Sequence, residues 1–293
     1  MRTLKIAIAA IIALVSISIN AQNTLRIKTN KASKQLVEVW IKAYMNINPE
    51  MCITLVDKDT EADLTLVNDI RDGGVTYVGR YAVAPVTSVE NPLYGEVTKH
   101  QWSTKDIKKL FFQNEDDLID ELEEKSKSSK LYDRMTVYSG SSSSSVAGIY
   151  AQHFGYQKGD IKGKKIAGDD LYLNNAIAKD KQSVTFNNIA YLYDTQSRQL
   201  KQDIALLPLD VKKEMRETLA SGNLDLTLDL LEQNKIESIA IENFGFAYSN
   251  FNSDIDKFLS WVISEGQQYN HQLGFLRLDE KEVKNQLKLL ATR

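Results

Sequence analysis

The first part of the chain carries a strand–helix–strand pattern, and this pattern restricts the fold more than any other feature of the sequence. Leu25–Lys28 alternates apolar and polar residues, as a half-buried strand does. Apolar residues then recur at helical spacing over Ser33–Asn46, and Pro49 closes that helix. Two further apolar segments, Ile53–Val56 and Ala62–Val67, have the length of strands. Because a helix that connects two strands implies that the strands run parallel, we expect a sheet with helices packed on it.

The rest of the chain continues this alternation. We expect further strands at Tyr81–Val86, Arg134–Tyr138, Val184–Tyr193, Ile204–Leu209 and Ile236–Ser249. We expect further helices after a Ser103-Thr104 cap and at Asp116–Glu124, Ser144–Phe154, Leu171–Lys179, Leu224–Gln233 and Ser253–His271. No internal repeat interrupts the pattern, so the sequence predicts an α/β fold.

Residues 1–21 have the features of a secretory signal peptide. Arg2 and Lys5 give a positive start, and Ile6–Ile19 is an almost unbroken apolar run. Cleavage is expected near Ala21, so that the exported protein would begin near Gln22. A membrane anchor is the alternative, but the run is short for a segment that crosses a bilayer. The sequence therefore predicts a periplasmic location.

Composition argues against several classes of function. The 36 Lys and Arg residues nearly balance the 39 Asp and Glu residues, so we expect no nucleic-acid partner. Cys52 is the only cysteine, so no internal disulfide can form. With one cysteine and three scattered histidines, no zinc site of the usual kind is expected, and no cofactor is expected either.

The run Ser139–Ser145 is the strongest candidate for a ligand-binding element. It contains one glycine and six serines and lies between a predicted strand and a predicted helix. Glycine lets the backbone approach a ligand closely, hydroxyl groups donate and accept, and a helix start offers unpaired N–H groups. We therefore expect Ser139, Gly140, Ser141 and Ser142 to bind a small anion or polar ligand. A flexible linker or a simple capping turn is the alternative.

A second loop, Thr29–Ser33, also joins a strand to a helix. Thr29 and Asn30 could present hydrogen-bond donors to the same ligand. Ser33, like the other two residues, could instead cap the helix, and capping explains the loop equally well.

Catalysis has little support in the sequence. Gly140 is not followed by the second glycine of a nucleophile elbow, and no phosphate-cradling Gly-x-x-x-x-Gly-Lys motif occurs. The pair Asp169-Asp170 lies in a polar stretch, where a solvated face is expected. Asn187-Asn188 is expected to form a turn or a cap. His153 is the one candidate base, and a hydrolase would be favoured only if it lay close to a serine hydroxyl. We expect no enzyme.

The order of these segments resembles the phosphate-type family of periplasmic substrate-binding proteins. The similar features spread over most of the chain: Leu25–Pro49 with its Asn48-Pro49 end, Ala62–Asn68, Tyr81–Pro85 with the turn Asn91-Pro92, Ser103–Phe111, Ser139–Ser145, Phe258–Gln267 and Gly274–Leu278. The last two segments are the most specific of them, because the Ser-Glu-Gly-Gln break at residues 264–267, which resembles the family's Ser-x-Glu-Gly-Gln signature, has no obvious folding role inside a helix.

The resemblance implies two α/β lobes with mixed sheets, joined by two crossover hinges, with the ligand between them. The first lobe would comprise residues 22–87 and 237–293, and the second would comprise residues 88–236. The implied function is capture of a small anion, most simply phosphate, for a membrane transporter of the ABC type. A monomer is expected.

Two departures from the family pattern bear on the ligand. The first loop reads Lys28-Thr29-Asn30-Lys31 where the family has a sequence such as Gly-Ser-Thr-Thr, and Tyr138 stands where the family usually has an arginine. Arg134 lies one turn of strand earlier, and Asp69 could accept a proton from a protonated phosphate. A buried dianion without an arginine loses its strongest hydrogen bonds. The alternative function is therefore a binding-protein fold with a degenerate cleft, acting as an interaction or sensor component of a cell-envelope complex.

Overall fold

The computed structural model describes residues 24–68, 74–113, 131–142 and 145–293. The expected signal peptide, the expected helix at Asp116–Glu124 and the candidate proton acceptor Asp69 lie outside the described residues. Within the described part of the chain, no helix is both long enough and apolar enough to cross a membrane.

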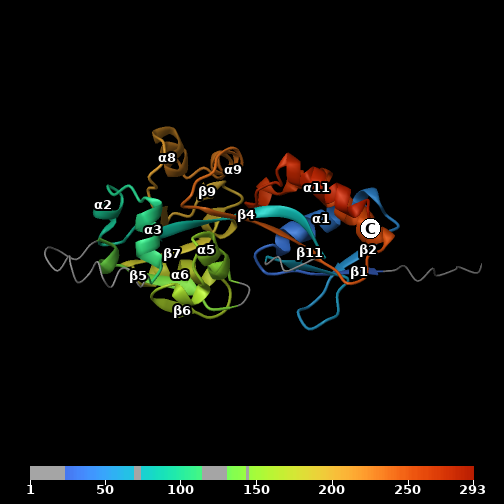
Figure 1. The fold of residues 1–293 in the computed structure, drawn as a ribbon, viewed down its shortest axis with the longest axis horizontal. Helices are drawn as coiled ribbons and strands as arrows, with labels where there is room; N and C mark the ends of the chain where they lie inside the picture. The colour runs from blue at the N-terminus through green and yellow to red at the C-terminus, as the bar shows by residue number, and fades with distance from the viewer. Residues whose placement is uncertain (1–23, 69–73, 114–130, 143–144) are drawn as a thin grey trace, which may run out of the picture.

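One mixed sheet of nine strands organises the described residues (Figure 1). Its order is β2-β1-β3-β11-β4-β7-β5-β6, and β10 pairs with β4 beside this path. The strands are β1 (Thr24–Lys28), β2 (Cys52–Leu55), β3 (Leu64–Val67), β4 (Val75–Ser88), β5 (Thr136–Gly140), β6 (Lys164–Ile166), β7 (Ser183–Asn188), β10 (Ile204–Leu206) and β11 (Ala240–Ala247). A separate two-stranded ribbon joins β8 (Tyr193–Asp194) to β9 (Gln199–Leu200).

Two long antiparallel strands, β4 and β11, pass through the centre of the sheet and connect two groups of parallel strands. β1 lies parallel to β2 and β3 on one side, and β5 lies parallel to β6 and β7 on the other. The β4–β11 pairing changes register between Phe244 and Gly245. These two strands are the crossovers between the lobes.

The direction of the strands decides where a site can form. β3 pairs through β11 with the beginning of β4, whereas β7 pairs antiparallel with the end of β4, with Asn188 opposite Val83. The carboxyl ends of both parallel groups therefore face the middle of β4, close to Tyr81. In open α/β sheets, ligands bind in the crevice outside the carboxyl ends of the strands.

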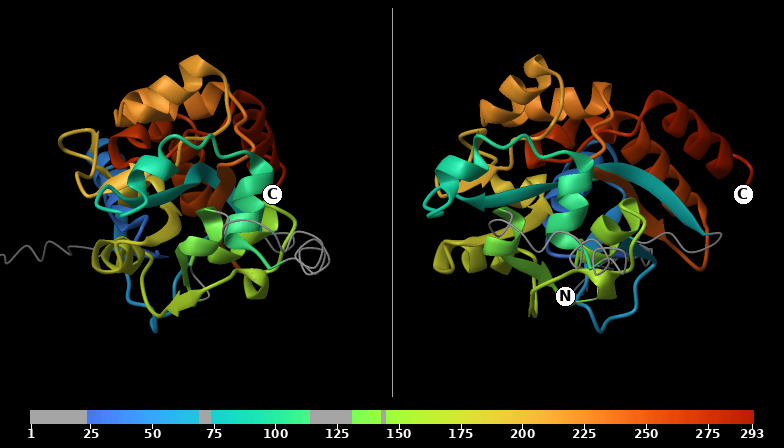
Figure 2. Two further views of the ribbon diagram at one scale, coloured as in Figure 1. Left: turned by 90° about the vertical axis from the view of Figure 1, so that its left-hand side faces the viewer. Right: turned by 60° about the vertical axis from the view of Figure 1, so that its left-hand side comes forward.

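Helices cover the sheet in two groups, which give the molecule its two lobes (Figures 1 and 2). In the first lobe α1 packs with α10 and α10 with α11; in the second lobe α5 and α6 pack beside β5 to β7, with α3 nearby. The helices are α1 (Lys34–Ile47), α2 (Tyr94–Val97), α3 (Thr104–Phe111), α5 (Ala147–His153), α6 (Leu171–Lys179), α7 (Ile189–Leu192), α8 (Lys213–Ala220), α9 (Leu224–Gln233), α10 (Ser253–Ile263) and α11 (Glu280–Leu290).

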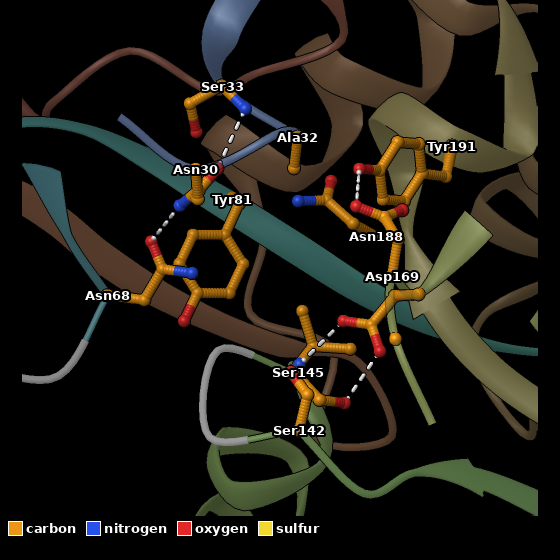
Figure 3. Close-up of a pocket in the computed structure, with 13 residues that line it drawn as sticks. Asn30, Ala32, Ser33, Asn68, Tyr81, Ser142, Ser145, Asp169, Asn188 and Tyr191 are labelled. Carbon is orange, nitrogen blue, oxygen red and sulfur yellow. Dashed lines mark hydrogen bonds between the residues drawn. The ribbon is translucent and has the colours of Figure 1, made fainter. Parts of the chain in front are cut away.

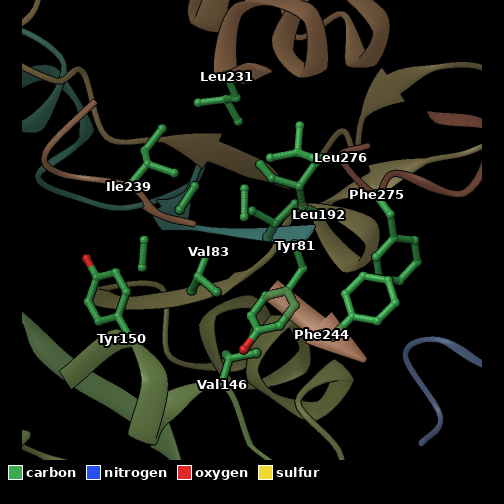
Figure 4. Packing of buried hydrophobic residues seen from close by; sticks show 14 of the residues in the cluster. Tyr81, Val83, Val146, Tyr150, Leu192, Leu231, Ile239, Phe244, Phe275 and Leu276 are labelled. Atoms are coloured by element: carbon green, nitrogen blue, oxygen red, sulfur yellow. The ribbon is translucent and has the colours of Figure 1, made fainter. Parts of the chain in front are cut away.

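A hydrophobic core runs through both lobes and is rich in aromatic rings (Figure 4). Tyr81 and Phe244 lie on the two crossing strands, with ring centroids 6.2 Å apart. In the second lobe the ring of Tyr150 stacks on that of Phe186 at 3.9 Å. The side chains on β4 and β11 therefore tie the two lobes into one core.

The signature that ends at Gln267 proves to have a folding role. Residues 264–267 follow the end of α10, and the Gln267 side chain is 8% exposed. Its amide donates to the carbonyl groups of Val78 and Val262, each at 2.9 Å, and its carbonyl accepts from the Leu278 N–H at 2.9 Å. The Gly266 carbonyl accepts from the Trp40 indole at 3.0 Å. This segment satisfies buried backbone groups that would otherwise lack partners.

The α/β prediction is confirmed, and α6 and α9 have the bounds expected from the sequence. The strand expected over Val184–Tyr193 is wrong in its second half. It ends at Asn188, whose side chain accepts from the Ala190 N–H at 3.0 Å and so begins α7. The helix expected over Ser253–His271 ends at Ile263 and continues as short 3₁₀ turns.

Candidate functional site

A polar pocket lies between the lobes, where the carboxyl ends of the strands face the middle of β4 (Figure 3). Its volume is about 30 Å³, which is enough for roughly two water molecules. Its lining comes from both lobes and consists of Asn30, Ala32, Ser33, Asn68, Tyr81, Ser142, Ser145, Val146, Gly168, Asp169, Asp170, Asn188 and Tyr191. Amides, hydroxyls and two carboxylates thus dominate the surface that a ligand would meet.

The first lobe supplies the loop between β1 and α1. The Asn30 side chain accepts from the Ser33 N–H at 2.9 Å and donates to Asn68 Oδ1 at 3.2 Å, so the two amides hold each other in place. Ser33 is 3% exposed, and its hydroxyl makes no hydrogen bond with any described residue. The α1 helix that follows has no side-chain cap and no acidic residue in its first turn. Its partial positive charge is therefore not neutralised locally.

The second lobe places a buried carboxylate, that of Asp170, at the start of α5. Asp170 is 8% exposed and accepts from the Ser145 hydroxyl at 2.6 Å and from the Val146 N–H at 2.8 Å. Burial raises the pKa of Asp170, and these two hydrogen bonds offset the effect only in part. A Cβ atom at Gly140 would overlap both the Ser145 hydroxyl and the Asp170 carboxylate, which explains the glycine in the serine run.

Asp169 lies next to this group and faces the same pocket. Its carboxylate accepts from the Leu171 N–H at 2.9 Å and from the Tyr191 hydroxyl at 3.2 Å. Burial raises the pKa of Tyr191 strongly, and the negative charge of Asp169 adds to the effect. Tyr191 therefore remains a neutral hydrogen-bond donor at physiological pH.

Two lysines hold the serine run from the side away from the pocket. Lys158 donates to the Ser141 carbonyl at 2.9 Å and also to that of Ser142. Lys165 donates to the Ser139 hydroxyl at 3.1 Å. Burial lowers the pKa of both lysines. Neither belongs to the lining, and no lysine or arginine occurs among the described residues that line the pocket.

The arginine considered from the sequence does not reach the pocket. Arg134 pairs with Glu96 at 2.7 and 3.1 Å. Tyr138, which stands at the position of the family's arginine, donates its hydroxyl to Asp180 at 3.1 Å. The described lining therefore has two carboxylates and no cation, and Lys158, outside the lining, balances only Asp170 in part.

The structure brings only part of the predicted site residues to the pocket. Asn30 and Ser142 line it, one from each lobe. Ser139 is buried against Lys165, Gly140 packs under Ser145, the Ser141 hydroxyl donates to the Ile166 carbonyl at 3.1 Å, and the Thr29 hydroxyl donates to the Asn30 carbonyl at 3.3 Å. These four residues shape the loops but are not in the lining.

Several lining residues were not predicted as ligand-binding. The expected solvated face at Asp169-Asp170 is wrong for Asp170, which is buried. A signal was present, because the two acids stand at the point where a strand ends and the Leu171–Lys179 helix begins. Asn188 acts as the cap that the sequence suggests, and it also lines the pocket.

The His153 ring makes no hydrogen bond with the described hydroxyl groups of the serine run. Its Nε2 atom is 2.9 Å from the Glu237 carbonyl oxygen, and its ring packs edge-on against Phe154. The condition under which a hydrolase would be favoured is therefore not met by the described residues.

One cluster of Asp229, Glu232 and His271 brings possible metal ligands within 4.8 Å of one another. Arg277 already donates to both oxygens of Glu232, at 3.1 and 3.2 Å from its Nε. Burial alone would raise the pKa of Glu232, but hydrogen bonds from His271 and Arg277 outweigh it and hold the pKa at about 2. The cluster is better explained as an ion-pair network that joins α9 to the C-terminal segment.

No protein-family model matches the chain, and no curated protein matches its sequence significantly. Solved structures do match its fold. A structure from Clostridium perfringens with bound phosphate, described as a phosphate ABC transporter substrate-binding protein, has a TM-score of 0.58 at 11% identity and covers 88% of this chain and 100% of its own. An ABC-type phosphate transport receptor from Vibrio cholerae has a TM-score of 0.56 at 12% identity, with coverage of 87% and 100%.

A regulatory domain shares the fold as well. The CcmR regulatory domain from Synechocystis, in complex with 2-PG, has a TM-score of 0.50 at 12% identity and covers 83% of this chain and 97% of its own. At these identities the similarity establishes the fold alone. The chain therefore has the two-lobed fold that binding proteins and regulatory domains share.

Proposed function

We propose that this chain is an extracytoplasmic solute-binding protein that holds a small polar ligand between its lobes and delivers it to a membrane transporter. In this proposal the first lobe comprises residues 22–87 and 237–293, and the second lobe comprises residues 88–236. Export would depend on cleavage of a signal peptide near Ala21. The proposal assigns the protein no catalytic step and no cofactor, and it takes the monomer as the binding unit.

The observation that carries the proposal is the convergence of polar side chains from both lobes on one pocket. Asn30 and Ser33 come from the first lobe, and Ser142, Asp169 and Asn188 come from the second. A ligand held by both groups would favour the closed arrangement of the lobes. Closure would exclude water and strengthen each hydrogen bond to the ligand.

Phosphate is the ligand that the fold neighbours and the serine run suggest. The hydroxyl and amide groups of the pocket support an oxyanion, because they can donate hydrogen bonds to it. The charge of the pocket opposes a dianion, because Asp169 and Asp170 face it and no described lining residue is cationic. A phosphate that binds here would have to be protonated or would have to overcome this repulsion. The proposal therefore takes the ligand class as a small polar solute and treats phosphate as the first compound to test.

Calorimetry of the purified protein tests the proposal directly. The panel comprises phosphate, sulfate, molybdate, small carboxylates, neutral sugars and amino acids, with a thermal-shift measurement for each. We expect at least one compound to release or absorb heat with one-to-one stoichiometry and to raise the melting temperature. If no compound does either, the solute-binding proposal is wrong.

A second candidate function is an interaction or sensor component of a cell-envelope complex. The specific observation in its favour is that Asp170 already accepts from the Ser145 hydroxyl and the Val146 N–H, the groups that a bound anion would use at the start of α5. Replacement of Ser142 by alanine separates the two functions. Loss of ligand affinity supports solute binding, whereas unchanged cellular function in a strain that needs the protein supports the interaction role.

A further inference from the structure

The pocket is lined by two side chains whose hydrogen-bond donors have no partner among the described residues, and by two carboxylates. The donors come from Ser33 at the start of α1 and from Asn188 at the end of β7. The carboxylates are those of Asp169 and Asp170. Figure 3 shows these groups around one pocket. The donors favour an anionic or accepting group in the ligand, whereas the carboxylates favour a cationic group.

The start of α1 favours a negatively charged or accepting group. The helix is 14 residues long, and neither a side-chain cap nor an acidic first-turn residue neutralises its first N–H groups. Ser33 is 3% exposed and lines the pocket, and its hydroxyl has no partner among the described residues. The start of α5 differs from that of α1, because its Ser145 hydroxyl and Val146 N–H already donate to Asp170.

Asn188 independently points to a ligand acceptor. The residue is 3% exposed, and its Oδ1 accepts from the Ala190 N–H at 3.0 Å, which fixes the direction of the amide. Nδ2 is therefore turned toward the pocket, as Figure 3 shows, and it donates to no residue in the described ranges. This N–H₂ group is open to the pocket and has no acceptor among the described residues, so a ligand with an acceptor at that place would gain a hydrogen bond.

The carboxylates favour a cation. Each oxygen of Asp169 and Asp170 accepts one hydrogen bond, from Leu171, Tyr191, Ser145 and Val146. An ionised carboxylate has about four acceptor positions, so both can accept more. Lys158 already interacts with Asp170 from outside the lining, but Asp169 forms no salt bridge with any described residue, so an ammonium group of the ligand is its natural counter-charge.

We propose, on the basis of the solute-binding function above, that the pocket takes a small zwitterion, such as an α-amino acid of the size of glycine or alanine. Its carboxylate would lie toward Ser33 and Asn188, and its ammonium group would lie toward Asp169 and Asp170. Such a ligand has no net charge, so it avoids the repulsion that a phosphate dianion meets. The pocket has room for roughly two water molecules, so the lobes would have to separate slightly to admit the five or six heavy atoms of glycine or alanine.

Calorimetry with matched fragments tests the charge pattern. Glycine and L-alanine are compared with acetate, which has only the anionic end, with methylamine, which has only the cationic end, and with phosphate. We expect a zwitterion to bind at least about tenfold more tightly than either fragment and than phosphate, because it forms two sets of charge-assisted hydrogen bonds. Phosphate binding more tightly than glycine overturns the inference, as does a zwitterion that binds no better than its fragments.

The wider calorimetry panel described for the proposed function, which includes neutral sugars and other oxyanions, distinguishes failure of this inference from failure of the proposed function. If a sugar or an oxyanion binds and no zwitterion does, the proposed solute-binding function is supported and the proposed zwitterionic ligand is wrong. If nothing in the panel binds, both are wrong.

Two variants test which side chains of the pocket bind the ammonium group and the carboxylate group of the ligand. Asp169→Asn removes the counter-charge of the ammonium group, and we expect it to weaken glycine binding about tenfold while acetate binding does not weaken. Asp59→Asn is the matched control, because Asp59 is exposed on a loop outside the lining, and it should bind glycine like the parent protein. Equal glycine affinity in Asp169→Asn and the parent overturns the assignment.

Ser33→Ala keeps the test valid if Asp169→Asn proves unstable. The Ser33 hydroxyl has no partner in the described residues, so its removal should leave the melting temperature unchanged. We expect the variant to bind glycine and acetate several-fold more weakly and methylamine unchanged. Unchanged glycine and acetate binding in Ser33→Ala contradicts the placement of the carboxylate.

Discussion

The Ser145 hydroxyl donates to the Asp170 carboxylate at 2.6 Å, and this contact joins the serine run to the start of α6, 25 residues later in the chain. The Val146 N–H donates to the second oxygen of the same carboxylate at 2.8 Å. The start of α5 is thus held by a group of the protein itself. The serine run, which the sequence suggested as an open anion loop, is in part a closed internal contact.

Replacement of Asp170 by alanine should destabilise the protein. The change leaves the buried Ser145 hydroxyl and Val146 N–H without acceptors, and we expect the free energy of unfolding to fall by about 1–3 kcal/mol. Urea denaturation followed by circular dichroism measures it. Asp59→Ala, on an exposed loop, should change it by less than about 0.5 kcal/mol. Equal stability of Asp170→Ala and the parent would contradict the buried contact.

Glu232 should make the protein sensitive to acid. Its pKa is lowered from the usual 4.5 to about 2 in the folded protein, so its contribution to stability is complete above pH 4.5 and is lost as the pH falls toward 2. The shift corresponds to at most about 3 kcal/mol. Glu232→Gln should therefore lose less stability over this pH range than the parent does.

The matched control for this prediction is Glu217→Gln, on an exposed part of α8. Its unfolding free energy should fall with acid in parallel with that of the parent. If Glu232→Gln also follows the parent, the network of Glu232 with His271 and Arg277 does not stabilise the fold.

Gln267 should be essential for stability although it lies outside the pocket. Its side chain makes hydrogen bonds to Val78, Val262 and Leu278, so Gln267→Ala leaves three backbone groups without partners. We expect a loss of about 2–4 kcal/mol in the free energy of unfolding. Gln268→Ala, at the exposed neighbouring position, should stay within about 0.5 kcal/mol of the parent in the same urea titration. A small effect at both positions would show that water replaces the amide.

Removal of one buried hydroxyl should stabilise the protein. The Tyr150 hydroxyl is buried and has no partner among the described residues, and burial raises the pKa of Tyr150 well above its usual value. Tyr150→Phe keeps the stacking on Phe186, and we expect it to raise the free energy of unfolding by about 1 kcal/mol.

Tyr193→Phe provides the contrast. The Tyr193 hydroxyl pairs with that of Thr227 at 3.1 Å, so the same change should lower the free energy of unfolding by about 1 kcal/mol. If the two variants shift the urea midpoint in the same direction, the hydroxyl of Tyr150 has a partner after all.

Local patterns were sufficient to predict elements that have strong periodicity or clear ends. α6 and α9 have the predicted bounds, and Ser103 caps α3 with the expected side-chain contact to the Asp106 N–H. α11 was not predicted although its sequence carried a signal: Val283, Leu287 and Leu290 recur at helical spacing, and the Asp279 side chain caps the helix by accepting from the Glu282 N–H. Its polar and charged residues outnumber these apolar ones, and the helix packs against α10.

The site was harder to predict because its burial arises between segments far apart in sequence. Asp170 looks like a solvated acid in its polar neighbourhood, and it is buried only because β5, β6 and β7 pair and bring the serine run against it. Asn188 was expected as a turn residue, and it reaches the pocket because β7 runs toward the middle of β4. The positions of Asn30 and Ser142 could be predicted, since both follow strands whose direction the helix connections indicate.

The two crossing strands have a mechanical consequence. β4 pairs along its length first with β11 and then with β7, so a ladder of hydrogen bonds with one change of register runs from one lobe into the other. The lobes are therefore joined by paired strands and not by a flexible linker. Any opening of the lobes would have to change the twist of these strands. The change of register between Phe244 and Gly245 is the most compliant point of the ladder. The stiffness of this point would set how far the lobes can separate and how quickly they return.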